Sequence, residues 1–252
     1  MNNYIIIPLR LGTIQRKKEN MSYQCGITDV TDFPLISYYV EGGNYKIIVD
    51  TGGTPPDGKK WAPYFRGADE ALDKALLKIG VSPDDIDIVI LTHLHWDHAS
   101  NNHLFPNARF IVQKKEYDYL IDLEPKVKNG FELDLVLRTE YAFVDGDCDL
   151  VDGISVVLAP GHTAGMQCVV VETKAGKYIL GADLITLFEN WEAVPHIANG
   201  GYYDLDAMME SLDKIDQLQG VVLPGHDEKV FEFHVYPEGE KVIDNSFFSV
   251  RT

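Results

Sequence analysis

The sequence has little that would place the chain in a membrane or outside the cell. Its 252 residues contain no run as long as the ~18 apolar residues that a membrane span needs, so no transmembrane helix is expected. The first residues have no basic region and no small-residue cleavage site, so no signal peptide is visible. The three cysteines, Cys25, Cys148 and Cys168, are odd in number and far apart, which favours buried thiols in a reducing compartment. Together these absences predict a cytoplasmic protein.

Positive charge is also scarce. The chain has 22 Lys and Arg against 39 Asp and Glu, which gives a formal net charge of −17. Such a surface repels phosphate backbones and anionic lipid, so neither nucleic acid nor a membrane is expected as the main partner. The apolar fraction of 45% is typical of a globular protein with a real core. No linker or charge block divides the sequence, and we expect residues 1–252 to form one domain.

Two common catalytic motifs are missing. The Gly-x-Ser-x-Gly pattern of serine esterases is absent, and so is a glycine-rich phosphate loop. The chemistry therefore has to come from other side chains.

The sequence does contain a compact run of metal-ligand side chains. His93, His95, Asp97 and His98 follow an apolar stretch, residues 86–92, that is typical of a buried strand. Imidazole nitrogen and carboxylate oxygen suit zinc, iron, cobalt and manganese. A short backbone cannot fold four such groups around one tetrahedral ion. The spacing therefore indicates two metals side by side and a hydrolase built around an activated water.

Three further candidates share a pattern in which an apolar strand runs into a glycine turn and then a ligand side chain. They are His162, Asp183 and His226. Seven ligands suit two ions that share one carboxylate and one solvent oxygen. Asp183 is the natural bridge, because a carboxylate has two oxygens whereas an imidazole binds one ion at a time. The remaining histidines lack this context, and we interpret them as structural: His103, His196 and His234.

Apolar patterning predicts a chain rich in strands with a few helices. Strands are expected over residues 4–11, 35–40, 45–49, 86–92, 109–112, 153–159, 167–172, 178–180 and 221–223, and helices over 68–79, 114–123 and 205–218. Residues 12–33 lack clear periodicity and are interpreted as an exposed excursion, either a flap or a subunit contact. Aromatic and apolar side chains in 61–65 and 187–191 predict either a pocket for an acyl chain or ordinary core.

These motifs resemble those of the metallo-β-lactamase superfamily, and within it the chain is most similar to the bacterial N-acyl-homoserine lactonases. The likeness runs over roughly residues 4–237. The matching segments are residues 92–98, Asp50-Thr51-Gly52, Pro160-Gly161-His162-Thr163, Gly181-Ala182-Asp183 and Pro224-Gly225-His226-Asp227, together with Ile111-Val112-Gln113 and Glu116-Tyr117.

The resemblance implies an α/β (α+β) fold, an αββα sandwich of two mixed β-sheets flanked by helices, with two divalent ions at one edge. Mixed His and Asp ligation suits Zn²⁺ best, with iron, cobalt or manganese left open. The resemblance assigns one ion to His93, His95 and His162, the other to Asp97, His98 and His226, and the bridge to Asp183. Asp50 either orients a ligand histidine through a hydrogen bond or is a plain turn residue.

The resemblance also implies a reaction. A hydroxide between the two ions would attack the carbonyl carbon of a small-molecule lactone, an N-acyl-homoserine lactone above all, and Asp97 would shuttle the proton. Hydrolysis of another lactone, ester or thioester is the alternative. A metal-binding sensor and an iron-dependent oxidoreductase are the non-hydrolytic alternatives, and a homodimer is left open.

One position departs from the lactonases. Three residues after the bridging aspartate they usually carry a tyrosine that contacts the substrate, and here that position is Thr186. Thr186 is therefore the second catalytic candidate beside Asp97. Either it acts through a water, another donor takes the tyrosine's place, or the substrate differs.

Overall fold

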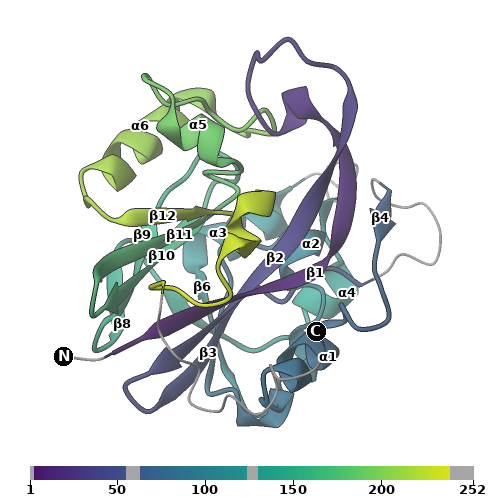
Figure 1. The fold of residues 1–252 in the computed structure, drawn as a ribbon, viewed down its shortest axis with the longest axis vertical. Helices are drawn as coiled ribbons and strands as arrows, with labels where there is room; N and C mark the ends of the chain where they lie inside the picture. Colours follow the sequence, from purple (N-terminus) through teal and green to yellow (C-terminus); the bar gives the residue numbers. More distant parts are fainter. Residues whose placement is uncertain (1–2, 55–62, 124–129, 239–252) are drawn as a thin grey trace.

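Two β-sheets lie face to face with helices on their outer sides (Figure 1). The computed structural model describes residues 3–54, 63–123 and 130–238. The first sheet has the strand order β4-β1-β2-β3-β5-β6-β7, and the second has the order β12-β11-β10-β9-β8. Both sheets are mixed, as the resemblance implied.

The first sheet combines an antiparallel half with a parallel half. Strands β1, β2 and β3 pair antiparallel, while β3, β5, β6 and β7 pair parallel. The strands are β1 (Ile5–Lys17), β2 (Val30–Gly42), β3 (Tyr45–Val49), β4 (Tyr64–Phe65), β5 (Ile88–Ile90), β6 (Arg109–Gln113) and β7 (Tyr141–Val144).

The second sheet is antiparallel except at one edge, where β11 and β12 pair parallel. Its strands are β8 (Cys148–Val151), β9 (Ile154–Leu158), β10 (Gln167–Thr173), β11 (Gly176–Ala182) and β12 (Val221–Pro224).

The helices are short. They are α1 (Leu72–Lys78), α2 (Trp96–Ala99), α3 (Lys114–Asp122), α4 (Leu133–Val136), α5 (Phe188–Glu192) and α6 (Leu205–Asp216), with 3-10 turns η1 (Lys18–Asn20), η2 (Pro83–Asp85), η3 (Asn102–Leu104) and η5 (Glu228–Glu232). The Asp204 side chain caps α6 by accepting a hydrogen bond from the Ala207 amide at 3.0 Å. Among the described helices, none has the length and apolar character to cross a bilayer.

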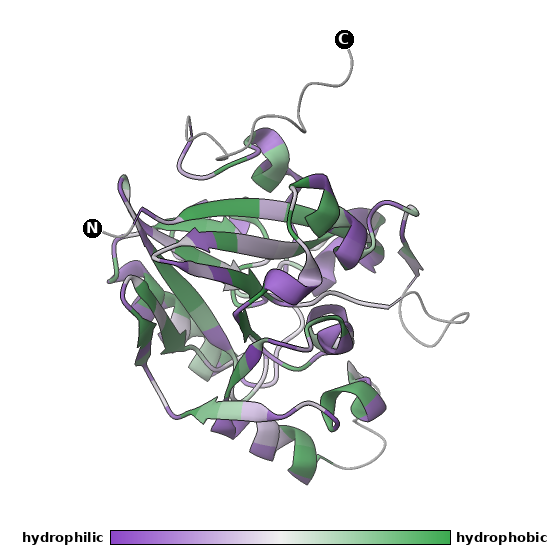
Figure 2. Cartoon of the chain, turned by 90° about the horizontal axis from the view of Figure 1, so that it is seen from below, coloured by the Kyte–Doolittle hydropathy of each residue, from purple (hydrophilic) through white to green (hydrophobic). Residues whose placement is uncertain are grey.

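Strand alternation distributes the apolar side chains between layers. Ile6 faces the core between the sheets, together with Val169 and Leu180 of the second sheet. Its neighbours Ile5 and Ile7 face the opposite side, where they belong to a core that includes side chains of α1 and α3. A third core lies between the second sheet and α6. Figure 2 shows the hydrophobic strands enclosed between more polar segments.

Residues 12–17 and 30–33 of the expected excursion lie in the two strands of an antiparallel ribbon, and the residues between them form the 3-10 turn η1 and an irregular loop. Strand β1 continues to Lys17 and β2 begins at Val30, so that both extend beyond the body of the sheet (Figure 1). The pairing register shifts between Arg10 and Thr13, where Gly12 takes a φ of +125°. This bulge and the charged residues beyond it conceal the two-residue alternation in the sequence.

The prediction of buried cysteines is correct for one residue only. Cys168 is buried in the second sheet, whereas Cys25 and Cys148 are partly exposed. All three carry free thiols.

Candidate active site

The structure brings the predicted ligand side chains together at one end of the two sheets. These side chains form three groups, and within each group the potential ligand atoms lie within 4.8 Å of one another. These groups are His93 with His95 and His162, His93 with His98 and Asp183, and Asp97 with His98 and His226. The first and third are the two ligand sets that the resemblance implies, and their role as ligands stays a prediction.

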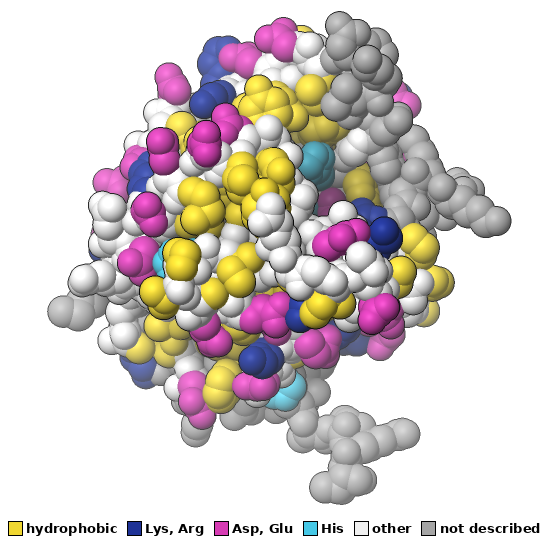
Figure 3. Space-filling model, turned by 90° about the horizontal axis from the view of Figure 1, so that it is seen from above, with side chains coloured by type: hydrophobic (Ala, Val, Ile, Leu, Met, Phe, Trp, Pro, Cys, Tyr) yellow, Lys and Arg dark blue, Asp and Glu magenta, His cyan; other side chains and the backbone are white. Residues whose placement is uncertain are grey.

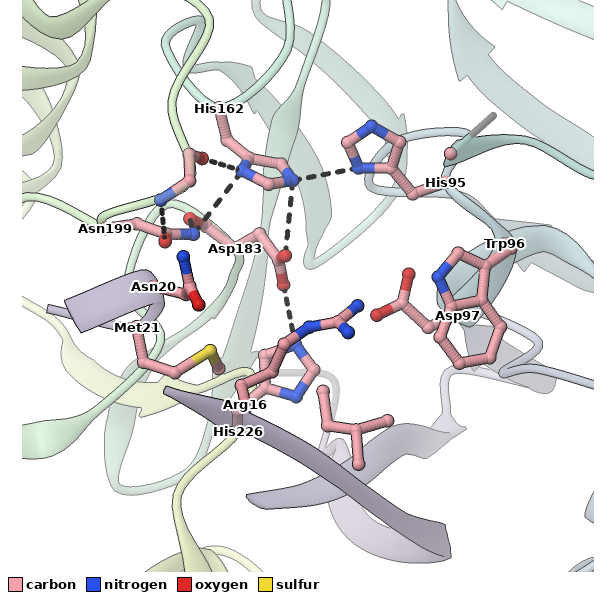
Figure 4. A pocket seen from close by; sticks show the side chains of 13 residues that line it. Arg16, Asn20, Met21, His95, Trp96, Asp97, His162, Asp183, Asn199 and His226 are labelled. Carbon is pink, nitrogen blue, oxygen red and sulfur yellow. Dashed lines mark hydrogen bonds and ion pairs between the residues drawn. The ribbon is translucent and has the colours of Figure 1, made fainter. Parts of the chain in front are cut away.

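In the first group, imidazole nitrogens face one another. His93 Nε2 lies 3.0 Å from His95 Nδ1. His95 Nδ1 also lies 2.9 Å from His162 Nε2 (Figure 4). Burial, followed by the neighbouring histidines, holds the pKa of His93 and of His95 well below the usual value. Both rings are therefore neutral at neutral pH, and their lone pairs are available to a cation.

Asp183 connects the groups. Its Oδ1 lies 2.9 Å from His226 Nε2 and 3.2 Å from His98 Nε2, and its Oδ2 lies 3.2 Å from His162 Nε2. Burial acts to raise the pKa of Asp183, but the histidines outweigh it and hold the pKa well below the usual value. The two oxygens thus reach both ligand sets, which is the arrangement that a bridging carboxylate requires.

Hydrogen bonds to the outer nitrogens orient the rings. His98 Nδ1 lies 2.7 Å from Asp50 Oδ2, and Asp50 itself accepts from the Thr92 amide and hydroxyl at 2.8 Å each. His226 Nδ1 lies 2.9 Å from the Pro34 carbonyl, and His162 Nδ1 contacts the Gly201 carbonyl. The hydrogen bond expected of Asp50 is present, and the inner nitrogens point into the cluster.

One buried atom tests whether the cluster fits metal ions. His98 is 2% exposed, and its Nε2 makes no well-directed hydrogen bond, although Asp183 Oδ1 lies 3.2 Å away. A buried polar atom without a partner is costly unless something else satisfies it. An imidazole nitrogen that faces two carboxylates and other imidazoles suits a divalent cation, so the residues present fit the metals that the resemblance implies.

Glu116 ties two ligand loops together, and sequence reasoning gave it no role. Its carboxylate accepts from the Leu94 amide at 3.1 Å, from the Thr163 hydroxyl at 2.6 Å and from the Gly165 amide at 3.1 Å. Leu94 lies between two ligand histidines, and Thr163 follows His162. A Cβ on Gly165 would lie 2.0 Å from the Glu116 amide nitrogen, so only glycine permits this approach.

A cavity of about 500 Å³ opens over the cluster. Its walls are formed by Ile14, Arg16, Asn20, Met21, His95, Trp96, Asp97, Gly130, His162, Asp183, Asn199, Gly201 and His226. The space-filling view shows a hollow with a histidine inside it (Figure 3). A cavity of this size holds a small molecule.

Thr186 lies outside this lining. It is fully buried, its hydroxyl donates to the Met21 carbonyl at 2.5 Å, and it accepts from the Asn190 amide at 3.0 Å. This geometry argues against direct contact between Thr186 and a molecule in the cavity, and a catalytic role for Thr186 stays a prediction.

The predicted acyl-chain pocket is not found among the described aromatic side chains. Tyr64 and Leu187 are core residues, and Phe188 packs against the core between the sheets. Phe65 is exposed, and Trp61 lies outside the described residues. The apolar part of the cavity wall instead comes from Ile14, Met21 and Trp96.

The other histidines lie apart from the cluster. His196 stacks on Trp191 with ring centroids 4.2 Å apart, and its Nδ1 lies 2.6 Å from the Trp191 carbonyl. His103 lines a separate hollow. Neither these two nor His234 belongs to a potential metal group of the described residues.

Asn199 is a site residue that no sequence signal indicated. Its amide donates to the Asp183 carbonyl at 2.8 Å and lies 3.4 Å from His162 Nδ1. It thereby supports the two ligands from the loop that precedes α6.

Comparison with known proteins identifies the family. The model of the metallo-β-lactamase superfamily matches residues 31–226. The chain belongs to this superfamily. An N-acyl homoserine lactonase of a Bacillus species is 28% identical over 228 residues, which are 83% of this chain and 88% of that protein. A probable metallo-hydrolase of Methanocaldococcus jannaschii is 31% identical over 160 residues, 63% of this chain and 66% of that protein.

Solved structures confirm the fold. A mutant of B. thuringiensis AiiA with N-decanoyl-L-homoserine bound at its active site has a TM-score of 0.80 at 23% identity, and the match covers 92% of this chain and 96% of that one. An N-acyl homoserine lactone hydrolase with N-hexanoyl-L-homoserine bound at its catalytic metal centre has a TM-score of 0.79 at 23% identity, with the same coverage. The resemblance inferred from the motifs is therefore confirmed.

Proposed function

We propose that this protein is a metal-dependent hydrolase that opens lactone rings, with N-acyl homoserine lactones as the foremost substrates. The observation that carries the proposal is the convergence of five imidazoles and two carboxylates on one cavity, with Asp183 between the two ligand sets. The relatives named as N-acyl homoserine lactonases give the reaction its substrate class.

The ligand roles that we propose follow the geometry. His93, His95 and His162 would hold one divalent ion, Asp97, His98 and His226 the other, and Asp183 both. When bound, the ions supply Lewis acidity, which polarises a carbonyl and lowers the pKa of water from about 15.7 towards 7. We propose Zn²⁺ as the ion, because imidazole nitrogen and carboxylate oxygen are common zinc ligands in proteins. Iron, cobalt and manganese accept the same donors and are the alternatives.

Asp97 is the residue we propose to move the proton. It lies on the cavity wall at the start of α2, opposite Asn199 and His162 (Figure 4). It takes the proton that water loses when its oxygen bonds to the carbonyl carbon. The carbon–oxygen bond of the ring then breaks, and Asp97 returns the proton to the ring oxygen. The products are a carboxylate and an alcohol, with one proton released to solvent.

The remaining features of the proposal concern the chain as a whole. We propose that residues 1–252 form one domain, which the core shared by the two sheets supports. The free thiols support a cytoplasmic location. The net charge of −17 favours a small molecule over nucleic acid or a membrane as the partner, and a homodimer stays a prediction.

A panel of lactones, esters and thioesters, assayed by proton release on protein loaded with two equivalents of metal, tests this function. We expect lactones to turn over fastest and H98A to abolish turnover. H103A is the matched control, because His103 lies outside the cluster, and it should retain full activity. Retained activity in H98A would contradict the two-ion site. Faster turnover of thioesters or linear esters than of lactones would show that those compounds, and not lactones, are the substrate class.

A further inference from the structure

Arg16 occupies the cavity wall opposite the ligand cluster. It lies near the end of β1, beyond the bulge, and strand alternation sends its side chain to the same face as Ile14. Both residues line the cavity, whereas Gln15 and Lys17 face away and bond to Asp32 and Glu19. The ribbon that the sequence concealed therefore places one guanidinium over the site.

This guanidinium has no partner among the residues that the structure describes. The nearby cations Lys17 and Lys18 pair with Glu19 and Glu189. Arg16 makes no such pair with any described residue, although the formal charge of the chain is −17. It is also the only Lys or Arg among the described residues that line the cavity. A charged side chain that is left without a protein partner in a concave site is available to a ligand.

Its direction and surroundings suit charge stabilisation. The Arg16 side chain points toward Asp97, a member of the ligand set that also contains His98 and His226 (Figure 4). Ile14, Met21 and Trp96 form an apolar wall beside it, and in such an environment a fixed charge acts more strongly than in water.

Among the described residues in or near the cavity, Thr186, Asn199 and Asn20 are already bonded or carry no charge. The Thr186 hydroxyl is bonded to the Met21 carbonyl in the core. The Asn199 amide is bonded to the Asp183 carbonyl. Asn20 is exposed and uncharged. Arg16 is therefore the cationic donor that the described part of the cavity wall leaves for a substrate.

We propose that Arg16 is a catalytic residue that contacts the ring oxygen of the lactone and stabilises the negative charge that gathers there as the ring opens. This inference rests on the proposed lactonase function. A guanidinium keeps its protons in proteins, so Arg16 stabilises charge without donating a proton. The electron pair of the broken carbon–oxygen bond stays on the ring oxygen, which then takes its proton from Asp97.

Two lactones with different leaving groups test this role. An alkyl γ-lactone releases an alkoxide, which needs the donor, whereas an aromatic lactone releases a phenolate, which needs it much less. We expect R16M to lower kcat about 10²-fold on the alkyl lactone and less than about 10-fold on the aromatic one, with little change in KM. Added guanidinium should restore part of the activity of R16A.

K17M is the matched control, because it removes the same charge from the same strand but on the face away from the cavity. It should change kcat less than twofold. R16M should keep the metal content and the Tm of the native protein, which separates a catalytic role from a structural one. If R16M does not fold, R16K replaces it, since lysine keeps the charge but loses the planar fork, and we expect about a 10-fold loss on the alkyl lactone.

Three results would overturn the inference. R16M that behaves as K17M on both lactones would remove Arg16 from catalysis. An equal loss of kcat on both lactones would show that Arg16 does not act on the leaving oxygen. Loss of a metal ion from R16M would show that Arg16 supports the ligand set and is not a catalytic residue. In each case wild-type turnover of lactones would leave the proposed function standing, whereas a wild type inert toward every lactone would overturn the proposed function as well.

Discussion

The two walls of the cavity are built in different ways. On the ligand wall several of the five rings have a second bond that fixes them: Asp50 bonds to His98, the Pro34 carbonyl to His226 and the Gly201 carbonyl to His162. On the opposite wall, Arg16 and Asn20 have no side-chain hydrogen bond within the described part of the chain. The comparison teaches that the ligand wall is arranged in advance to hold metal, while the ribbon wall leaves its polar atoms available to a substrate.

The strongest way to break the comparison is to remove a support from the ligand wall. D50N keeps the size of the side chain but weakens its hold on His98 Nδ1, 2.7 Å away. We expect metal affinity to fall by about 10–100-fold, measured by competition with a chromophoric chelator. D32N is the control, since Asp32 is exposed and its carboxylate accepts from Gln15, away from the cluster. Unchanged affinity in D50N would show that the supporting bond is dispensable.

A pH titration sharpens the same comparison. Burial acts to lower the pKa of His98, but Asp183 and Asp50 outweigh it and hold the pKa well above the usual value in the ion-free protein. Its proton stabilises the ion-free fold fully below the unfolded value of about 6.5, and this stabilisation is lost as pH rises through the raised folded pKa.

Metal binding must displace that proton. We therefore expect metal affinity to rise with pH, by up to about 10-fold per unit for each proton displaced, until the raised pKa is passed. Proton release on metal addition, measured with an indicator dye in weak buffer, checks this. Binding without proton release at neutral pH would contradict the assignment of His98 as a ligand.

A smaller effect, on stability, is expected from a change at Glu116, which joins two of the ligand loops. E116Q keeps the shape of the side chain but brings an amide NH₂ towards groups that donate, the Thr163 hydroxyl and the Gly165 amide. We expect a loss of about 1–3 kcal/mol in the free energy of unfolding, measured by denaturant titration. D118N on the same helix is the control, because Asp118 is exposed and pairs with Lys114. Equal stability of the two variants would argue against this role of Glu116.

The smallest effect is expected at Thr186. T186V removes a buried hydroxyl that bonds to Met21 and Asn190, so a loss of about 1 kcal/mol in stability is expected. Because this hydroxyl lies outside the cavity lining, kcat should stay within about twofold of the native value. If T186V loses about as much turnover as is expected for R16M, Thr186 has a catalytic role and the case for Arg16 is weaker.

How far the sequence predicts this site depends on whether a feature is local. The convergence of the candidate ligands was predictable because His93 to His98 form a local motif, and because His162, Asp183 and His226 each follow a strand and a glycine. The sandwich followed from the family resemblance. The strand predicted over 86–92 is shorter in the structure, at Ile88–Ile90: Ile86 still closes the 3-10 turn η2, and Leu91 and Thr92 lie beyond the end of the strand.

Other features depend on contacts between distant segments. Glu116 acquires its role only when α3 meets two loops, and its bond to Gly165 joins residues far apart in sequence. The role of Arg16 depends on a ribbon whose bulge at Gly12 interrupts the alternation that a strand normally shows. Thr186 was placed at the site by its spacing from Asp183, but the chain turns its hydroxyl into the core. Spacing alone does not determine where such a side chain points.

The central claim is that two cations lie side by side in the cluster around Asp183. The most direct test is elemental analysis of catalytically active protein combined with anomalous diffraction at the metal absorption edges. The account predicts two divalent ions per chain, one beside His93, His95 and His162, and one beside Asp97, His98 and His226, with Asp183 touching both. A single ion, or none, in fully active protein would contradict it.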